Sequence, residues 1–246
     1  MKILVIGEIC EDIFIYGEVN RLSPEAPIPV LVPFEKNIND GMAGNVVNNI
    51  KSLRPTWDNF SIHQQSKITK TRYVEKKSNH MFLRVDEGED KIEPLKLNEE
   101  IIQIIKKTDA LIISDYNKGF LTDDVIIEIT KHSKLSIMDS KRKINSKIIN
   151  AFSFIKLNEK EFERNSFDSD DFDKLLITLG SKGAKYKNKI FSSPDPKETT
   201  DVSGAGDTFT SAFTIKYLES KNVEESIIFA NKMASIVVSK RGVATP

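Results

Sequence analysis

Short apolar runs that alternate with longer amphipathic stretches restrict this chain more than any other feature. The apolar runs predict buried strands over residues 2–7, 110–114, 135–138, 153–156 and 175–179. The other stretches predict helices over residues 43–53, 97–107, 122–131, 205–218 and 223–238. Apolar strands separated by helices are typical of a mostly parallel sheet covered by helices on both faces. We therefore expect an α/β fold whose ligands bind beyond the carboxyl ends of the strands.

Three other segments have the pattern of exposed strands. Residues 68–75 and 80–86 alternate apolar and polar side chains, as a pair of exposed strands does. Residues 23–29 contain several prolines, which favour an extended backbone. We expect these segments to form a small β lid, within about 14–36 and 69–88, on a single domain that spans residues 1–246.

The composition excludes several classes of partner. Lys plus Arg and Asp plus Glu number 36 each, so the formal net charge is zero, whereas nucleic-acid binding usually needs a basic excess. No apolar run approaches the roughly 20 residues that cross a bilayer, and the apolar start of the chain is too short for a signal peptide. The single cysteine, Cys10, fits a reducing compartment. We expect a cytoplasmic protein that binds neither nucleic acid nor membrane.

The most informative stretch is residues 201–207 (DVSGAGD), which lead directly into a helix. Gly204 and Gly206, on either side of Ala205, allow a tight turn whose backbone N–H groups are free to bind an anion. The helix that follows adds the positive end of its dipole. This pattern predicts an anion site for a phosphoryl group that gathers charge in a transition state. A carboxylate there would repel phosphate, so we interpret Asp207 as the general base for an attacking hydroxyl. The alternative is that the glycines only shape a turn and Asp207 caps the helix.

Other catalytic and nucleotide motifs are absent. The chain has no G-x-x-x-x-G-K-[ST] phosphate loop and no G-x-S-x-G nucleophile turn. His63, His80 and His132 are scattered without zinc spacing, and we expect them at the surface.

The 201–207 stretch resembles the glycine-alanine-glycine-aspartate motif of the PfkB, or ribokinase-like, carbohydrate kinases. Further matches follow in the family order, each after an expected strand: Gly7 with Asp12, residues 41–45 (GMAGN), residues 158–161 (NEKE) and residues 178–183 (TLGSKG). The resemblance implies a ribokinase-like fold, a mostly parallel sheet with helices on both faces and a small β lid. It also implies a kinase that uses ATP and Mg²⁺ to phosphorylate a hydroxyl of a small sugar or sugar phosphate.

The resemblance implies a role for each matching residue. The catalytic group would be Asp207 with the amides of Gly204, Ala205 and Gly206. The nucleotide side would be formed by Thr178, Gly180, Gly183 and, in the last helix, Asn231, with Asn158 and Glu161 holding Mg²⁺ through water. The acceptor would be held by Asp12, Gly41, Asn45, Asp115 and Lys118. An alternative for the N-x-x-E match is a helix N-cap, with Glu161 closing a capping box on Asn158.

A narrower resemblance links the chain to the heptose 7-phosphate kinases of lipopolysaccharide precursor synthesis. It rests on residues 21–30 (RLSPEAPIPV), 114–119 (SDYNKG), 71–73 and 82–86. It implies conversion of D-glycero-D-manno-heptose 7-phosphate to the 1,7-bisphosphate. Arg72, Arg84, Lys118 and Lys141 are candidates for binding the 7-phosphate, and Asp139 is expected to be a turn residue at the same edge. Many of those kinases are fused to a nucleotidyltransferase, whose H-x-G-H motif is absent here, so this chain resembles the kinase part alone.

The chain also departs from the family pattern. It is short between residues 50 and 69, 163 and 175, and 185 and 201, and Met42 replaces the usual second glycine of the sugar-site turn. Two alternatives therefore stay open: another acceptor of the same family (ribose, fructose, a nucleoside or an aminosugar), or a degenerate, non-catalytic ligand-binding homologue. Relatives in this family often pair their lids, so we expect a homodimer through the lid.

Overall fold

The computed structural model describes residues 1–194, 204–238 and 245–246. Its main sheet has eight strands in the order β12-β11-β10-β9-β8-β7-β1-β4. The strands are β1 (Lys2–Gly7), β4 (Asp58–Ile62), β7 (Ala110–Asp115), β8 (Ser136–Ser140), β9 (Phe154–Asn158), β10 (Leu175–Thr178), β11 (Ala184–Tyr186) and β12 (Lys189–Phe191). The pairs from β4 to β10 are parallel, and β11 and β12 add an antiparallel edge. The mostly parallel sheet expected from the sequence is present.

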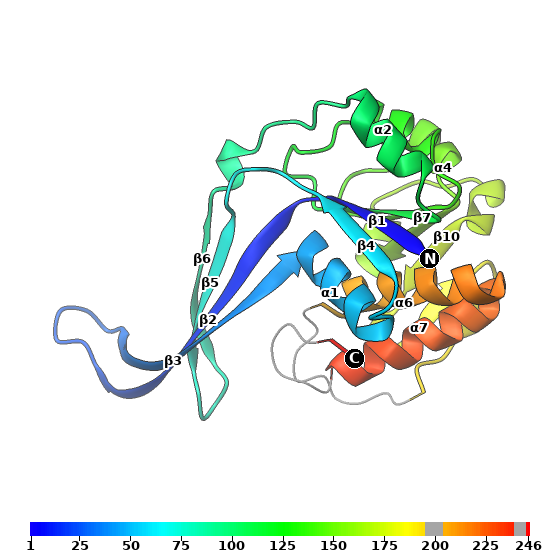
Figure 1. The fold of residues 1–246 in the computed structure, drawn as a ribbon. Helices are drawn as coiled ribbons and strands as arrows, with labels where there is room; N and C mark the ends of the chain where they lie inside the picture. The colour runs from blue at the N-terminus through cyan, green and yellow to red at the C-terminus, as the bar shows by residue number, and fades with distance from the viewer. Residues whose placement is uncertain (195–203, 239–244) are drawn as a thin grey trace.

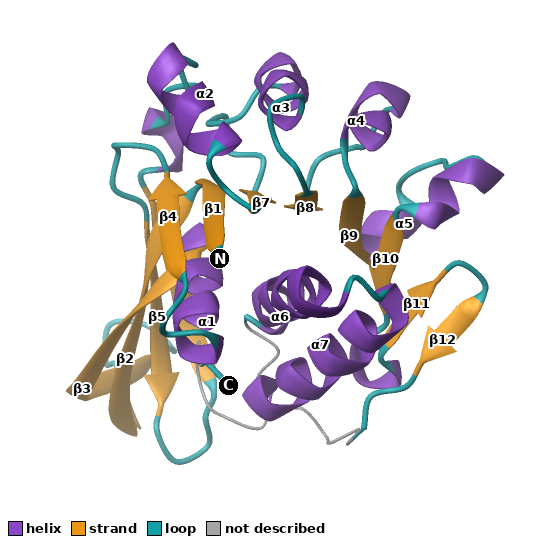
Figure 2. Ribbon diagram, turned by 45° about the vertical axis from the view of Figure 1, so that its right-hand side comes forward, coloured by secondary structure: helices purple, strands orange, loops and turns teal. Residues whose placement is uncertain are grey.

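Helices cover both faces of this sheet, as Figure 2 shows. One layer contains α1 (Ala43–Leu53), α6 (Ala205–Ser220) and α7 (Val223–Val238), and the other contains α2 (Glu99–Lys106), α3 (Asp123–Thr130), α4 (Ser146–Ala151) and α5 (Glu159–Glu163). Short 3₁₀ turns occupy Glu89–Lys91, Ser169–Asp173 and Gly180–Lys182. Because successive side chains of a strand point to opposite faces, Ile3 and Val5 enter one apolar core while Leu4 and Ile6 enter the other. The continuous apolar runs of the sequence reflect this burial on both sides.

The lid is a separate four-stranded sheet in the order β3-β2-β5-β6. Its strands are β2 (Ile9–Leu22), β3 (Pro29–Met42), β5 (Thr69–Glu75) and β6 (Met81–Glu87). In Figure 1 the lid projects from the main sheet, and the β2–β3 hairpin reaches farthest from the core. Since β2 starts two residues after β1 ends, the lid grows directly from the carboxyl edge of the main sheet.

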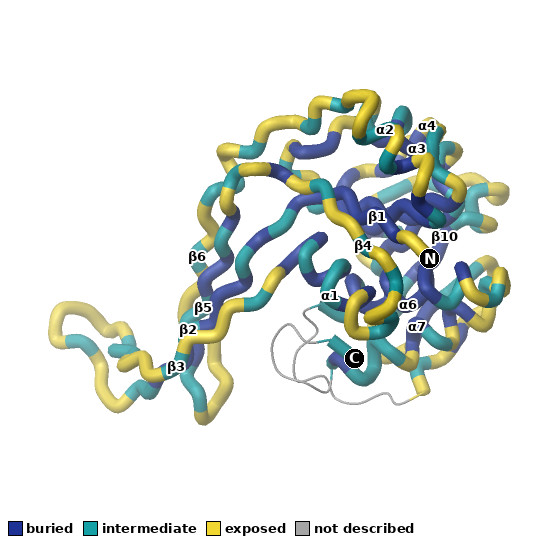
Figure 3. Tube along the Cα trace, viewed as in Figure 1, coloured by how far each residue is buried: buried dark blue, intermediate teal, exposed yellow. Residues whose placement is uncertain are grey.

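The lid leaves much of its surface in solvent, as Figure 3 shows for β3 and β6. Phe14, Tyr16 and Val74 form a small buried cluster within it. Several large apolar side chains remain exposed, namely Val32 (58%), Phe34 (57%), Ile38 (55%), Met81 (49%) and Leu83 (54%).

None of the helices in the described ranges is long and apolar enough to cross a membrane.

Candidate active site

Asp207 lies in the first turn of α6, and Gly204 is the N-cap residue of this helix. Gly204 has a positive φ of 82°, which glycine adopts without strain. The carboxylate of Asp207 is buried and accepts a hydrogen bond from Asn45 Nδ2 at 2.8 Å and a long one from the Tyr116 hydroxyl at 3.4 Å. Neither bond is to an amide of α6, so the carboxylate is not used as a cap. Residues 201–203, the first part of the predicted cradle, lie outside the described residues.

Burial, and then the negative charge of Asp139, raise the pKa of Asp207 to about 7. A general base is most effective when its pKa lies near the operating pH, because a large fraction is then ionised and the group is still basic enough to accept a proton. Burial also raises the pKa of the Tyr116 hydroxyl well above its usual value, so this group stays a donor to Asp207. The electrostatics of the site therefore suit the predicted general base.

Two hollows meet at Asp207. One, of about 180 Å³, lies on the lid side, and the other, of about 340 Å³, lies above the ends of β8, β9 and β10. Tyr116, Gly204 and Asp207 line both of them. A proton acceptor between two adjoining cavities can face an acceptor molecule on one side and a phosphoryl donor on the other.

The lid-side hollow contains the residues that the sequence predicted for acceptor binding, Asp12, Gly41 and Asn45, together with Met42. A Cβ on Gly41 would lie 2.1 Å from Asp12 Oδ2, so only glycine leaves room for that carboxylate. Met42, the departure from the family turn, is itself buried and has a positive φ of 56°. Its side chain packs with Cys10 and Ile68 beneath the lid.

Three cations of the lid also enter this hollow: Lys70, Arg72 and Arg84. Arg72 and Arg84 face each other directly across β5 and β6, a placement that like charges normally destabilise. In the structure Arg72 pairs with Asp12 at 2.5 Å, Arg84 makes a bidentate pair with Asp86 and Lys70 lies 3.4 Å from Glu89. Lys70 was not predicted from the sequence, although its i, i+2 spacing from Arg72 places both side chains on one face of a strand.

The second hollow contains Thr178 and Gly180, as predicted for the nucleotide side, and also Asp139, Lys141 and Lys156. Asp139 is not a turn residue, because it lies within β8 and pairs with Lys156 at 2.9 Å. Burial opposes ionisation of this carboxyl, but the charges of Lys156 and Lys141 outweigh burial and hold the pKa of Asp139 below its usual value.

Asn158 and Glu161 form a complete capping box at the start of α5. Asn158 Oδ1 accepts from the Glu161 amide at 2.9 Å, and Glu161 Oε2 accepts from the Asn158 amide at 2.7 Å. The other oxygen of Glu161 pairs with Lys141 at 2.5 Å. Among the described residues no cluster of three or more acids, histidines or cysteines could hold a metal ion. Mg²⁺ that keeps most of its waters and bridges phosphates needs only one or two carboxylates, so a buried Glu161 beside the hollow fits such an ion.

Asp115 and Lys118 are placed apart from both hollows. Asp115 is fully buried and forms a bidentate pair with Arg142, at 2.6 and 3.0 Å, while Ser140 donates a further hydrogen bond to it. Lys118 pairs with Glu89 at 2.5 Å. Tyr116, which lies between them in the sequence, lines both hollows, whereas the predicted residues Asp115 and Lys118 line neither.

Gly183 and Asn231 support the antiparallel edge of the sheet. Gly183 has a positive φ of 96°, and a Cβ on it would lie 2.1 Å from the carbonyl oxygen of Phe191. The Asn231 side chain donates to the same carbonyl at 2.7 Å. Neither residue lines the hollow above β10.

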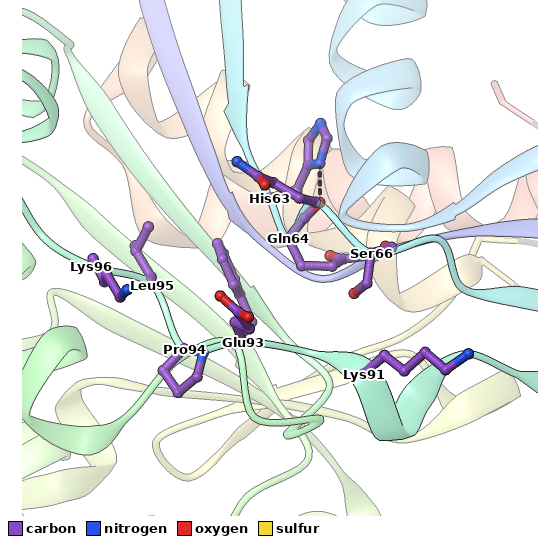
Figure 4. A pocket seen from close by; sticks show the side chains of 10 residues that line it. His63, Gln64, Ser66, Lys91, Glu93, Pro94, Leu95 and Lys96 are labelled. Atoms are coloured by element: carbon purple, nitrogen blue, oxygen red, sulfur yellow. Dashed lines mark hydrogen bonds between the residues drawn. The ribbon is translucent and has the colours of Figure 1, made fainter.

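A larger hollow, of about 580 Å³, lies between the loop after β4 and the segment that returns from the lid (Figure 4). Figure 4 shows His63 and Gln64 on one side of it and Glu93 and Leu95 on the other. The Gln64 side chain bonds both the amide and the carbonyl of Ile9, at 3.0 and 2.7 Å, and so ties this loop to the base of the lid. None of the predicted catalytic residues lines this hollow.

The parallel sheet, the lid and the carboxylate at a helix N-terminus define a class, the ribokinase-like phosphotransferases. Residues 58–246 match the model of the pfkB family carbohydrate kinases, and the chain belongs to this family. Its members transfer a phosphoryl group to an alcohol of a sugar, and the expected enzyme class is confirmed.

Curated relatives agree with this assignment. The chain is 34% identical over 296 residues to the bifunctional protein HldE of Helicobacter pylori, with 99% of this chain and 64% of the relative covered. The bifunctional protein HldE of a Nitratiruptor species is 31% identical over 289 residues, with 99% and 63% covered. The chain thus spans less than two thirds of the length of these relatives.

Solved structures confirm the expected fold class. Ribokinase from Thermotoga maritima superposes with a TM-score of 0.73 at 20% identity, covering 98% of this chain and 94% of the other. The ribokinase of Arabidopsis thaliana, solved with ribose and ATP, gives a TM-score of 0.70 at 18% identity and covers 98% and 93%.

Proposed function

We propose that this carbohydrate kinase transfers the γ-phosphoryl group of ATP to a sugar phosphate, heptose 7-phosphate, and produces heptose 1,7-bisphosphate. The observation that carries the proposal is the set of three lid cations, Lys70, Arg72 and Arg84, in the same hollow as Asp12, Asn45 and Asp207. An unphosphorylated sugar offers these cations no negative charge. A sugar phosphate could place its phosphate at the lid cations and its reacting hydroxyl at Asp207, so that the substrate spans the hollow.

The proposed reaction needs one proton transfer at Asp207. The acceptor hydroxyl gives its proton to the Asp207 carboxylate while its oxygen forms a bond to the γ-phosphorus. The bond between that phosphorus and the β–γ bridging oxygen breaks, and ADP leaves. The hydrogen bond from Asn45 keeps the carboxylate aimed at the hydroxyl, and the amides of Gly204, Ala205 and Gly206 receive the charge that develops on the phosphoryl oxygens.

Bound Mg²⁺ would supply charge neutralisation for the nucleotide phosphates, with Asn158 and Glu161 holding its waters. We expect Glu161→Gln to raise the Mg²⁺ concentration for half-maximal activity about 10–100-fold, as for other outer ligands of metal ions. The glutamine keeps the size of the side chain and can still accept from the Asn158 amide. Activity measured over a Mg²⁺ series would check this, with the exposed neighbour Glu159→Gln as control. An unchanged Mg²⁺ dependence with a lower Tm would assign Glu161 to the capping box alone.

We also propose a homodimer that forms through the lid. The exposed apolar side chains of β3 and β6, which include Phe34 and Leu83, are the kind of surface that a twofold contact covers with one self-complementary patch. We expect light scattering over a dilution series to give a dimer, and Phe34→Asp with Leu83→Asp to give a monomer. Ile228→Asp, on the equally exposed Ile228 of α7, should leave the dimer intact. A wild-type monomer at all micromolar concentrations would contradict the proposal.

A coupled assay of ADP release against a panel of free sugars and sugar phosphates tests the function. The expected result is the highest kcat/KM with heptose 7-phosphate. Faster turnover of ribose, fructose or a nucleoside would move the chain to another acceptor of the family. Nucleotide binding without turnover of any acceptor would favour a non-catalytic homologue.

A further inference from the structure

Asp139 and Lys156 form an ion pair deep in the hollow above β8 and β9. Lys156 is 3% and Asp139 8% exposed, and their charged atoms lie 2.9 Å apart. Removing two charges from water costs as much as or more than their attraction returns, so such a pair is a poor means of stabilising a fold. Its position against a functional cavity suggests a use for the charges themselves.

The ammonium of Lys156 lies directly beside the phosphoryl cradle. A Cβ on Gly206 would come within 2.8 Å of Lys156 Nζ. Gly206 does not have the positive φ of Gly204, so its backbone could be adopted by other residues. The space that glycine leaves at position 206 is therefore occupied by the lysine head group. The start of α6 and one buried cation therefore lie next to each other.

The Lys156 ammonium also has donors to spare. In the ranges that the structure describes, its hydrogen bond goes to Asp139 Oδ2, whereas an ammonium has three N–H groups. Asp139 is held in turn by the Thr210 hydroxyl at 3.3 Å. Lys141, the other cation of this hollow, already pairs with Glu161. Among the described residues each of these two ammonium groups has one carboxylate partner and keeps unused donors, and of the two it is Lys156 that lies beside Gly206.

We propose that Lys156 binds the terminal phosphoryl group of the nucleoside triphosphate, and that Asp139 is its counter-ion while the cavity is free of phosphate. This inference rests on the proposed function, because it names the ligand of the same site. On binding, the ammonium shares its charge between Asp139 and the phosphoryl oxygens without leaving its place beneath Gly206. A charged hydrogen bond of this kind is preorganised for the negative charge that shifts during transfer.

The test compares ADP with the non-hydrolysable β,γ-imido analogue of ATP by calorimetric titration in the presence of Mg²⁺. We expect Lys156→Met to weaken the analogue about 10–100-fold, the effect of one charged hydrogen bond, and to leave ADP nearly unchanged. Asp139→Asn, which frees the ammonium, should bind the analogue as well as the wild type or more tightly. Lys160→Met, at an exposed lysine of α5, is the matched control and should change neither titration.

Lys156→Met leaves Asp139 buried without a partner and can fail to fold. The double variant Asp139→Asn with Lys156→Met removes both charges and keeps the inference open to refutation. It should fold and still bind the analogue about 10–100-fold more weakly than the wild type, because the phosphate contact itself is gone. A folded double variant that keeps the wild-type preference for the triphosphate analogue would overturn the inference.

The pH profile of kcat/KM tests a separate point, which is that the charges of Asp139 and Lys156 shift the pKa of Asp207 in opposite directions. Asp207 is faced by Asp139, Lys156, Lys141, Tyr116 and Asn45. Removing the Asp139 charge lowers the pKa of Asp207, so the acid limb should move to lower pH. Removing the Lys156 charge leaves Asp139 unopposed, so the acid limb should move to higher pH. Shifts of the same sign, or none, would count against the pair.

The two proposals fail in different ways. If the wild type phosphorylates a sugar phosphate but Lys156→Met binds the analogue normally, the function stands and the inference is wrong. If the wild type binds no triphosphate at all, the proposed function and the inference are both wrong.

Discussion

Replacing Asp207 by asparagine is expected to lower kcat about 10²–10⁴-fold while ATP still binds. Asparagine has the same size and can keep a contact with Asn45, but its amide oxygen cannot hold the proton of the attacking hydroxyl. The negative charge of Asp207, which repels phosphate, also disappears, so nucleotide phosphates should bind at least as well as in the wild type. Initial rates of ADP release and a separate nucleotide titration measure the two effects.

Asp124→Asn is the matched control for this prediction. Asp124 is an exposed acid that also lies in the first turn of its helix, α3, and lines neither of the two hollows at Asp207. This variant should keep the wild-type rate. If Asp207→Asn also kept most of its rate, Asp207 would not be the base, and the two hollows that meet at it would need another proton acceptor.

The strands and helices of the core were predictable because burial leaves a clear pattern. The apolar run at 2–7 coincides with β1, and the amphipathic stretch at 43–53 coincides with α1. Strand β4 (Asp58–Ile62) was not predicted, because it is a short edge strand with polar side chains, and α4 is too short to show a helical period. Strand β2 carries several acids and owes its length to pairing with β3 and β5, which no local pattern reveals.

A sequence motif predicts which backbone segments lie at the candidate site, but it predicts the direction of the individual side chains less well. The sequence identified Asp12, Gly41 and Asn45, and the structure places them in one hollow with Asp207. It also pointed to the end of β7 and the loop that follows, but named Asp115 and Lys118 there. Neighbouring side chains of an extended segment point in opposite directions, so Asp115 contacts Arg142 while Tyr116 contacts Asp207.

Removing the lid cations is the second change with a large expected effect. Lys70→Gln with Arg84→Gln deletes two of the three positive charges in the lid-side hollow and leaves Arg72 paired with Asp12. Each charged contact to a phosphate contributes about 10–100-fold in binding, so kcat/KM for heptose 7-phosphate should fall about 10²–10⁴-fold. The loss should appear mainly in KM, because a phosphate far from the reacting hydroxyl is held equally in the ground and transition states.

The unphosphorylated sugar distinguishes this effect from damage to the lid. A sugar without a phosphate offers these two cations no negative charge to bind, so the variant and the wild type should turn over the free sugar at similar, low rates. Lys36→Gln, at an exposed lysine of β3, removes a lid charge outside the hollow and should change neither substrate. Equal losses with the free and the phosphorylated sugar would mean that Lys70 and Arg84 only support the lid. A loss confined to the phosphorylated sugar would mean that the lid itself selects the acceptor, since Asp207, the proposed proton acceptor, is unchanged in both arms.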